Sequence, residues 1–377
     1  MMNYEYDGFF RIGMHHRNER NAIIQHGTMT LVRADALKNH GNWSEWCICE
    51  DAELGLRLMD AGYDTVYVDE VMGRGLTPDT FYAFKKQRRR WAQGAMQILK
   101  AHTRTLFGRS RVDAGQRYHF VAGWFSWIGD ALHLVFAFGA MAWTIGIVGW
   151  PHLFSLPIQL FMVPLMVFFV CKALMGPLLY MRRVKCSLPD VLGSALAGMA
   201  LSHGIAQGVF AGLWHKTADF ENTEKGANDK PGGQAATAVA VTEAGAAADA
   251  GATAVTTATA AKAPRAKAPV GAAWAGVREE ALMLFALLSC VGAMAWTRLP
   301  NHLESAMWMT ILVLQAVPYA ASIVCAGLSA LPEFQPRSRR RSSLQAAAAS
   351  AAPRLLATAR AISGVDEGRG GRTPSKA

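Results

Sequence analysis

Long apolar runs fill much of the chain after residue 120, and their lengths predict membrane-spanning helices. Residues 121–150 and 157–181 are each long enough to cross a bilayer, and a basic cluster follows the second run. Residues 281–297 and 305–329 form two more runs, and a basic tail follows them. Because basic residues are in excess on the inner side of membranes, we place that cluster and the tail inside.

Polar residues in this region allow two interpretations, both for one apolar segment and for two side chains. Residues 188–214 are long enough to cross a membrane but contain many small and polar residues, so their length permits either a span or an interfacial helix. Asp130 and His133 lie inside the first run. They either face a pore or partner helix, or lie close enough to the interface to reach water.

The first 110 residues have the pattern of part of an α/β domain. Ala22–Val32 and Tyr63–Asp69 are strand-like, and Glu50–Ala61 is a helix with acidic residues in its first turn and Gly62 as its stop. Parallel strands need both faces covered, and so short a segment provides little core. We therefore expect the chain to start partway through such a domain.

Thr77–His102 is predicted to be a long helix, with Thr77 as its N-cap. Gln87, Arg90 and Trp91 are spaced to project from one face, and Gly94 leaves a gap beside them. An amide, a guanidinium group and an indole suit a phosphorylated sugar. The alternative is a basic amphipathic helix on a membrane surface, anchored by its tryptophan.

Composition supports a membrane protein and excludes several other classes. Hydrophobic residues make up 51% of the chain. The net charge of +10 falls largely beside apolar runs, so we expect no nucleic-acid partner. The six cysteines show no paired CxxC spacing and four lie in or beside apolar segments, which argues against a disulfide framework or a zinc site. The N-terminus has no signal-peptide core.

Three motifs, in order and beside membrane spans, resemble those of processive family 2 glycosyltransferases of the bacterial cellulose synthase, or β-glucan synthase, type. Cys49-Glu50-Asp51 matches a Thr-Glu-Asp motif with cysteine in place of threonine, and residues 87–91 fit Gln-x-x-Arg-Trp in full. Residues 220–225 resemble a gating loop, Phe-x-Val-Thr-x-Lys, with asparagine at the valine position. His26-Gly27-Thr28 loosely matches the family's acceptor-side motif.

The resemblance implies a catalytic role for one carboxylate. Inverting glycosyl transfer needs a base that takes the proton of the acceptor hydroxyl, and Asp51 matches that base. The alternative is an acid that only complements the helix dipole. Glu50 is its neighbour at the substrate site, and Arg90 would stabilise the leaving diphosphate.

The resemblance also implies roles for residues that bind the sugar acceptor and for residues of the gating loop. Trp91 would stack under the acceptor sugar and Gln87 would help to place it, with Gly27 and Thr28 on the acceptor side. The loop that closes over the bound nucleotide would use three residues, namely Phe220, Thr223 and Lys225.

The implied architecture is a partial α/β glycosyltransferase domain of the GT-A type followed by an all-α multi-span region. Because the gating loop must face the cytoplasm, residues 188–214 would lie along the interface, leaving four spans. We place the protein in the inner membrane, with its catalytic part and C-terminus cytoplasmic. The expected segments are 1–110 (catalytic), 118–214 (two spans and an interfacial helix), 215–231 (gating loop), 232–273 (Ala-rich linker), 274–330 (two spans) and 331–377 (basic tail).

The family's donor half has no counterpart in this sequence. Mg²⁺ is expected for the family, but its Asp-x-Asp site is absent from the chain. The chain alone would then be inactive unless the missing N-terminal half or another synthase subunit completes it. A non-catalytic membrane component of a polysaccharide synthase or export complex is the alternative. The expected partners are a nucleotide sugar, with UDP-glucose favoured over UDP-N-acetylglucosamine, a growing β-linked polysaccharide and the lipid bilayer.

Overall fold

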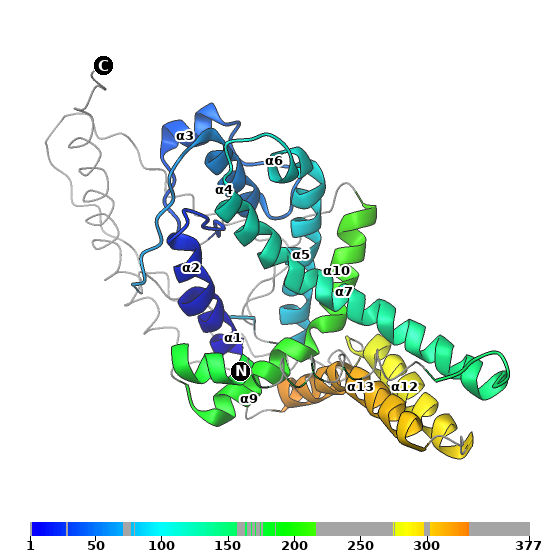
Figure 1. Ribbon diagram of the computed structural model, residues 1–377. Helices are drawn as coiled ribbons and strands as arrows, with labels where there is room; N and C mark the ends of the chain where they lie inside the picture. The colour runs from blue at the N-terminus through cyan, green and yellow to red at the C-terminus, as the bar shows by residue number, and fades with distance from the viewer. Residues whose placement is uncertain are drawn as a thin grey trace, which may run out of the picture.

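A computed structural model shows a helical protein with two parts (Figure 1). The head comprises the helices within residues 2–107, and the membrane-type helices are those within residues 114–330. It describes residues 2–27, 29–70, 77–78, 80–156, 176–184, 186–215, 276–297 and 302–331, together with Val163, Val167, Val170, Leu174 and Trp274.

The N-terminal segment is helical from the second residue onward. Helix α1 (Met2–Gly8), the π-helical η1 (Phe9–Met14) and α2 (His15–Asn18) follow one another without a break. Sequence patterning gave this segment no structure. Helix α1 packs against α9 (Leu188–Ala200), which lies far away in the sequence (Figure 1).

No strand occurs among the residues that the structure describes, so the α/β expectation is not confirmed. The two segments predicted to be strands contain extended backbone without a strand partner. The N–H of Thr65 donates to Oδ1 of Asn21 at 2.6 Å, and the N–H of Tyr67 donates to Oδ1 of Asn18 at 2.7 Å. Side-chain amides therefore take the place of a neighbouring strand at these two donors.

Helix α3 (Ala34–Asn39) was not predicted, whereas α4 (Glu50–Ala61) matches its predicted bounds. Helix α4 ends at Gly62, which has a φ of 91° and donates its N–H to the carbonyls of Leu58 and Met59. The left-handed backbone at that position favours glycine, so the predicted stop is confirmed.

Helix α5 (Phe81–Ala101) begins later than predicted. Its N-cap is Thr80, whose side chain accepts the N–H of Ala83 at 3.1 Å. The predicted cap at Thr77 is therefore wrong. Two threonines three residues apart offer the same capping chemistry, and only the backbone conformation distinguishes them.

Two helices lead from the head to the membrane-type region. Helix α6 (Thr103–Phe107) is short, and α7 (Ala114–Gly149) is the longest helix described. Helix α7 starts with a capping box in which Asp113 and Gln116 each bind the other's backbone N–H.

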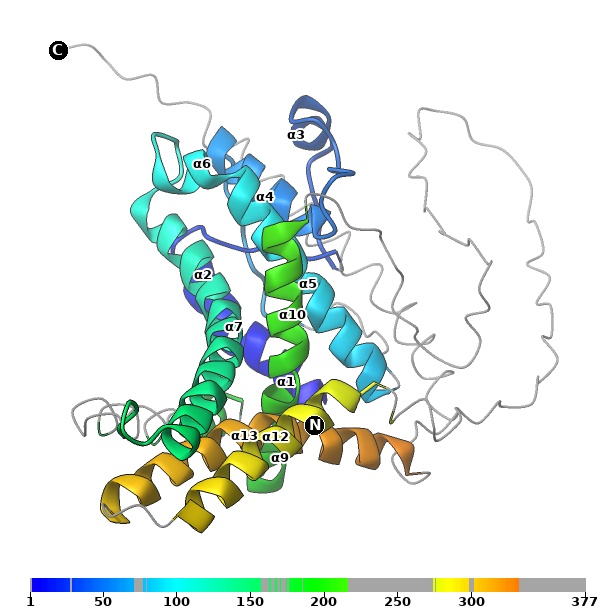
Figure 2. The same cartoon turned by 90° about the vertical axis from the view of Figure 1, so that its right-hand side faces the viewer.

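Helix α10 (Ser202–Trp214) follows α9 after Leu201 and runs beside α5 (Figure 2). Its glycines allow this close approach. An added Cβ at Gly204 would lie 2.8 Å from Cγ of Lys85, and one at Gly208 would lie 2.2 Å from the carbonyl oxygen of Arg89. The small residues that left the 188–214 segment ambiguous therefore form a packing surface for α5.

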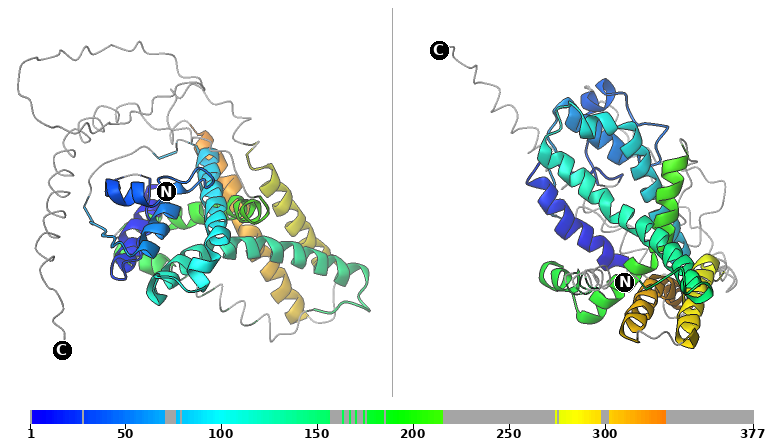
Figure 3. Two further views of the ribbon diagram at one scale, coloured as in Figure 1. Left: turned by 90° about the horizontal axis from the view of Figure 1, so that it is seen from above. Right: turned by 45° about the vertical axis from the view of Figure 1, so that its right-hand side comes forward.

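Helices α12 (Arg278–Thr297) and α13 (His302–Ala330) lie beside each other and extend together with the second half of α7 (Figures 1 and 3). Four helical segments among the described residues are long and apolar enough to span a membrane, namely Ala114–Gly149, Leu188–Trp214, Arg278–Thr297 and His302–Ala330. The spans predicted at 121–150, 281–297 and 305–329 fall on three of these. The predicted span at 157–181 lies largely outside the described residues, and the interfacial placement of 188–214 remains a prediction.

Two apolar cores hold the molecule together. One joins α4, α5 and α10 with the first half of α7 and the end of α13, and the other joins the second half of α7 with α12 and α13. Large apolar side chains such as Phe138, Ile145 and Phe285 remain more than half exposed on the outside of the second group. Such surfaces fit contact with lipid.

The polar residues inside α7 contact partner helices. Oδ1 of Asp130 accepts a hydrogen bond from the Ser202 hydroxyl of α10 at 2.7 Å. The ring of His133 lies 5.9 Å from the ring of Tyr319 on α13. Both residues thus contact partner helices, as one of the two interpretations predicts, while the other, their distance from the interface, stays untested.

Candidate functional site

Asp51 lies in the first turn of α4, facing the loop that contains Gly27. Its Oδ1 accepts the N–H of Ala52 at 2.8 Å, and its Oδ2 lies 3.4 Å from where a Cβ on Gly27 would be. Burial raises the pKa of Asp51, although the N–H groups of Ala52 and Gly27 and the charge of Arg90 oppose the rise. A partly buried carboxylate of this kind can accept a proton from a hydroxyl.

Cys49 connects this carboxylate to α5. Its Sγ lies 3.9 Å from the carbonyl oxygen of Trp91, within the range of a weak S–H donor. A Cβ on Gly94 would lie 2.4 Å from the same sulfur. The gap that Gly94 was predicted to leave for a ligand is thus occupied by Cys49, which corrects that expectation. Burial raises the pKa of Cys49 well above its usual value, so the thiol is neutral and serves as packing.

Arg90 acts electrostatically on both acidic residues of the motif. Burial raises the pKa of Glu50, and the charge of Asp51 adds to the rise while that of Arg90 opposes it. The structure therefore places Asp51 beside Gly27, while the charge of Arg90 on α5 acts on both Asp51 and Glu50 of α4.

Gln87 and Trp91 share a neighbour that the sequence did not identify. The hydroxyl of Tyr6 donates to Oε1 of Gln87, and the Tyr6 ring meets the Trp91 indole edge-on, with centroids 6.2 Å apart. The Arg88 guanidinium carbon lies 4.4 Å from the centre of the indole. This contact is a cation–π interaction. The Trp91 side chain is half-buried.

Glu53 is a second residue that sequence patterning missed. Only 1% of it is exposed, and it accepts from Ser44 Oγ at 2.6 Å, from Arg57 Nε at 2.9 Å and from His102 Nε2 at 2.8 Å. Burial alone would raise the pKa of Glu53, but these partners outweigh burial and lower it. This network ties the end of α5 to α4. The i, i+4 spacing of Glu53 and Arg57 was the available signal.

A polar junction links the head to the membrane-type helices. Lys85 on α5 pairs with Glu280 of α12, which is fully buried, and its Nζ also donates to the Gly276 carbonyl at 2.8 Å. The neighbouring Glu279 accepts from Gln207 and lies 3.0 Å from Nε2 of His203 on α10. The acidic start of α12 therefore contacts both α5 and α10.

Several predicted site residues fall outside the described part of the chain. They are Thr28 and the gating-loop residues Phe220, Thr223 and Lys225. Their roles remain predictions.

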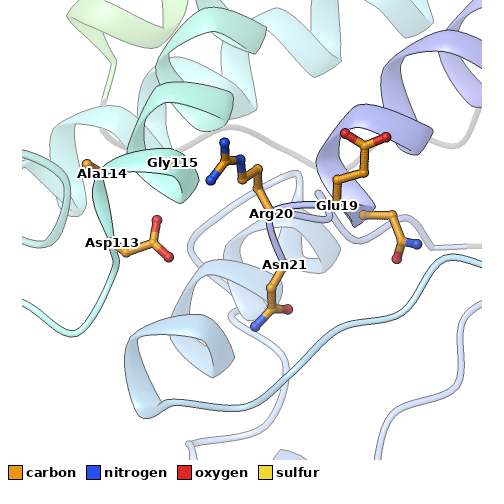
Figure 4. A pocket seen from close by; sticks show the side chains of 7 residues that line it. Glu19, Arg20, Asn21, Asp113, Ala114 and Gly115 are labelled. Carbon is orange, nitrogen blue, oxygen red and sulfur yellow. The ribbon is translucent and has the colours of Figure 1, made fainter.

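No group of three or more His, Cys, Asp or Glu side chains that could hold a metal ion occurs in the described ranges. A shallow hollow lies between the end of α2 and the start of α7, lined by Asn18, Glu19, Arg20, Asn21, Asp113, Ala114 and Gly115 (Figure 4). It contains none of the predicted site residues.

Comparison with known proteins identifies the family of the chain. A model of "Glycosyl transferase family group 2" matches residues 7–201, just over half of the chain. Glucomannan 4-beta-mannosyltransferase 1 of Cyamopsis tetragonoloba is 30% identical over 99 residues, which cover 26% of this chain and 19% of that protein. The protein of the same name from Oryza sativa subsp. japonica is 27% identical over 113 residues, covering 30% and 22%.

The chain thus spans about a fifth of the length of these curated relatives. The family match includes the whole of α4 and α5, on which Asp51, Arg90 and Trp91 lie. The chain belongs to glycosyl transferase family group 2.

Proposed function

We propose that the protein is a membrane-embedded inverting glycosyltransferase that adds a hexose to a growing β-linked polysaccharide and passes the polymer across the inner membrane. The donor that we assign is UDP-glucose. The observation that supports this proposal is the contact of Cys49, which begins the motif that contains Asp51, with the backbone carbonyl of Trp91 on α5, together with the charge of Arg90 acting on Asp51.

The chemistry follows from these side chains. Asp51 takes the proton of the acceptor hydroxyl as that oxygen attacks the anomeric carbon of the donor. The bond from the anomeric carbon to the diphosphate breaks, and the electron pair leaves with the phosphate oxygen. Arg90 stabilises the charge that gathers there. The raised pKa of Asp51 makes its carboxylate a better proton acceptor once it is ionised.

We also propose that the site lies on the cytoplasmic face, close to the membrane-type helices. Helix α5, which carries Arg90 and Trp91, packs on α10 and is joined through Lys85 to the start of α12. A sugar that leaves Trp91 would thus lie close to the membrane-type helices. We assign the head and the C-terminus to the cytoplasm on the strength of the basic residues that flank the spans.

A mannosyl donor is a second candidate. The similar proteins are named glucomannan 4-beta-mannosyltransferases, which favours a mannose nucleotide as the donor of this chain too. The α4–α5 site does not separate the two sugars, because an aromatic platform and a diphosphate-binding cation serve either of them.

The test is a transfer assay in lipid nanodiscs, with radiolabelled UDP-glucose or a nucleotide-linked mannose and Mg²⁺. Polymer formed by the wild type, alone or joined to a complete donor half, and lost in Asp51→Asn supports the enzyme. Because the pKa of Asp51 is raised, activity should fall on acidification at a higher pH than an ordinary aspartate would give. If a longer form with a complete donor half is inactive as well, a non-catalytic membrane component is the better description.

A further inference from the structure

Three aromatic rings surround Arg88 at the start of α5. Phe84, Arg88 and Trp91 are spaced to share one face of the helix, and Tyr6 of α1 adds the third ring. The Arg88 guanidinium carbon lies 4.7 Å from the Tyr6 centroid and 5.1 Å from that of Phe84, in addition to its contact with Trp91. Only 8% of Arg88 is exposed, so water screens these cation–π contacts weakly.

Tyr6 contacts both residues to which we assign the acceptor sugar. Its hydroxyl donates to Oε1 of Gln87, and its ring contacts the indole of Trp91. It also packs against Phe84, with centroids 5.9 Å apart. Tyr6 reaches these residues from a helix more than 70 residues away in the sequence, so a motif search of α5 alone does not identify it.

The hydrogen bond from Tyr6 fixes the orientation of the Gln87 side-chain amide. A glutamine amide has one oxygen that accepts and one nitrogen that donates two hydrogens. Since the Tyr6 hydroxyl occupies the oxygen, the nitrogen is the end that can meet a substrate. A sugar presents acceptors at its hydroxyl, ring and glycosidic oxygens. Gln87 is thereby specified as a donor toward the acceptor chain.

We propose that Tyr6 is a positioning residue of the acceptor site, which fixes Gln87 as a hydrogen-bond donor to the acceptor sugar and holds the edge of the Trp91 indole. The proposal rests on the proposed function, in which Gln87 and Trp91 bind the acceptor. Tyr6 itself touches neither the reacting atoms nor the donor. Its loss should therefore affect the acceptor and leave the donor unaffected.

The experiment uses Tyr6→Phe, which removes the hydroxyl and keeps the ring. Binding of a β-linked gluco-oligosaccharide and of UDP-glucose is measured by calorimetry in nanodiscs, on the full chain in complex with a complete donor half. We expect oligosaccharide affinity to fall about three- to tenfold, as for the loss of one hydrogen bond, with UDP-glucose affinity unchanged. Tyr118→Phe is the matched control, since Tyr118 is 67% exposed on α7.

A second variant tests the polarity argument. Gln87→Glu replaces the donating nitrogen by an acceptor, so it should weaken oligosaccharide binding at least as much as Tyr6→Phe. Adding Tyr6→Phe to Gln87→Glu should then cost little more, because the two changes remove the same donor. Full additivity would overturn the proposal.

The remaining outcomes separate this proposal from the function on which it rests. If Trp91→Ala binds the oligosaccharide as the wild type does, or if the wild type does not bind it, the acceptor site itself is refuted and the Tyr6 proposal with it. If Trp91→Ala weakens binding but Tyr6→Phe behaves like Tyr118→Phe, only the Tyr6 proposal is overturned. Tighter binding by Tyr6→Phe would also overturn it, because Tyr6 would then be covering the site. Equal losses for oligosaccharide and UDP-glucose would show a general structural role and have the same consequence.

Discussion

Gly208 on α10 offers a sharp test of how the site helix is held. An added Cβ at this position would lie 2.2 Å from the carbonyl oxygen of Arg89 and 3.1 Å from Cβ of Ala92. Ordinary carbon–oxygen contacts begin at about 3.3 Å. Gly208→Ala therefore requires α10 and α5 to separate by about 1 Å. The atom in the way belongs to the α5 backbone, so a side-chain rotation cannot relieve the contact.

The expected cost combines two opposing effects. Alanine is better than glycine in a helix by about 1 kcal/mol. Overpacking in a well-packed interior typically costs about 1–3 kcal/mol, and a contact with a helix backbone belongs at or above the upper end of that range. We expect the free energy of unfolding to fall by about 2 kcal/mol. For domains of 150–250 residues this corresponds to a melting temperature lower by about 4–8 °C.

The assay is thermal unfolding in detergent micelles, followed by far-UV circular dichroism. The matched control is Gly129→Ala on α7, since nothing lies within 4 Å of a Cβ there. That variant should unfold at or above the wild-type temperature. A Gly208→Ala protein as stable as Gly129→Ala would refute the close packing of α10 on α5.

Three further predictions concern the contacts of α4 and α5. Gly94→Ala should reduce sugar transfer by about tenfold or more even where the protein stays folded, because its Cβ would displace Cys49 and the motif that follows it. Glu53→Gln should lower stability at pH 7 by about 1–3 kcal/mol. Because the pKa of Glu53 is lowered in the folded protein, its carboxylate stabilises the fold above the ordinary pKa of 4.5. That stabilisation is lost as the pH falls through the lowered pKa. The Glu53→Gln variant should show no such loss in acid unfolding. Glu280→Gln should destabilise by about 3 kcal/mol because it leaves Lys85 buried without its partner, whereas Lys85→Met with Glu280→Leu should recover most of that loss in the same melting assay.

The parts of this fold that local sequence rules determine were predictable. Helix α4 was predicted at its observed bounds because an acidic first turn and Gly62 mark its two ends. The apolar runs gave three of the candidate spans for a similar reason, since length and composition alone define them. The strand-like segments failed because a strand depends on a partner, and the donors of Thr65 and Tyr67 are satisfied by asparagine side chains.

The candidate site, too, was predictable only where local sequence rules determine it. Helical spacing placed Gln87, Arg90 and Trp91 together, but it does not show which residues of other helices meet them. Cys49 looked like a simple replacement of threonine in a motif. Its Sγ in fact fills the space above Gly94 and contacts the Trp91 carbonyl, so the motif and the site helix fit each other through one sulfur atom and one missing side chain.

From that fit we predict that the two motifs depend on each other. A side chain at position 94 would meet the sulfur and Cβ of Cys49. That change would move Asp51 relative to Trp91. Since transfer depends on placing a hydroxyl between the carboxylate and the anomeric carbon, a displacement of about 1 Å is enough to lower the rate by about a hundredfold. We therefore expect the packing of Cys49 on Gly94 to help set the distance between the proposed base, Asp51, and the proposed sugar platform, Trp91.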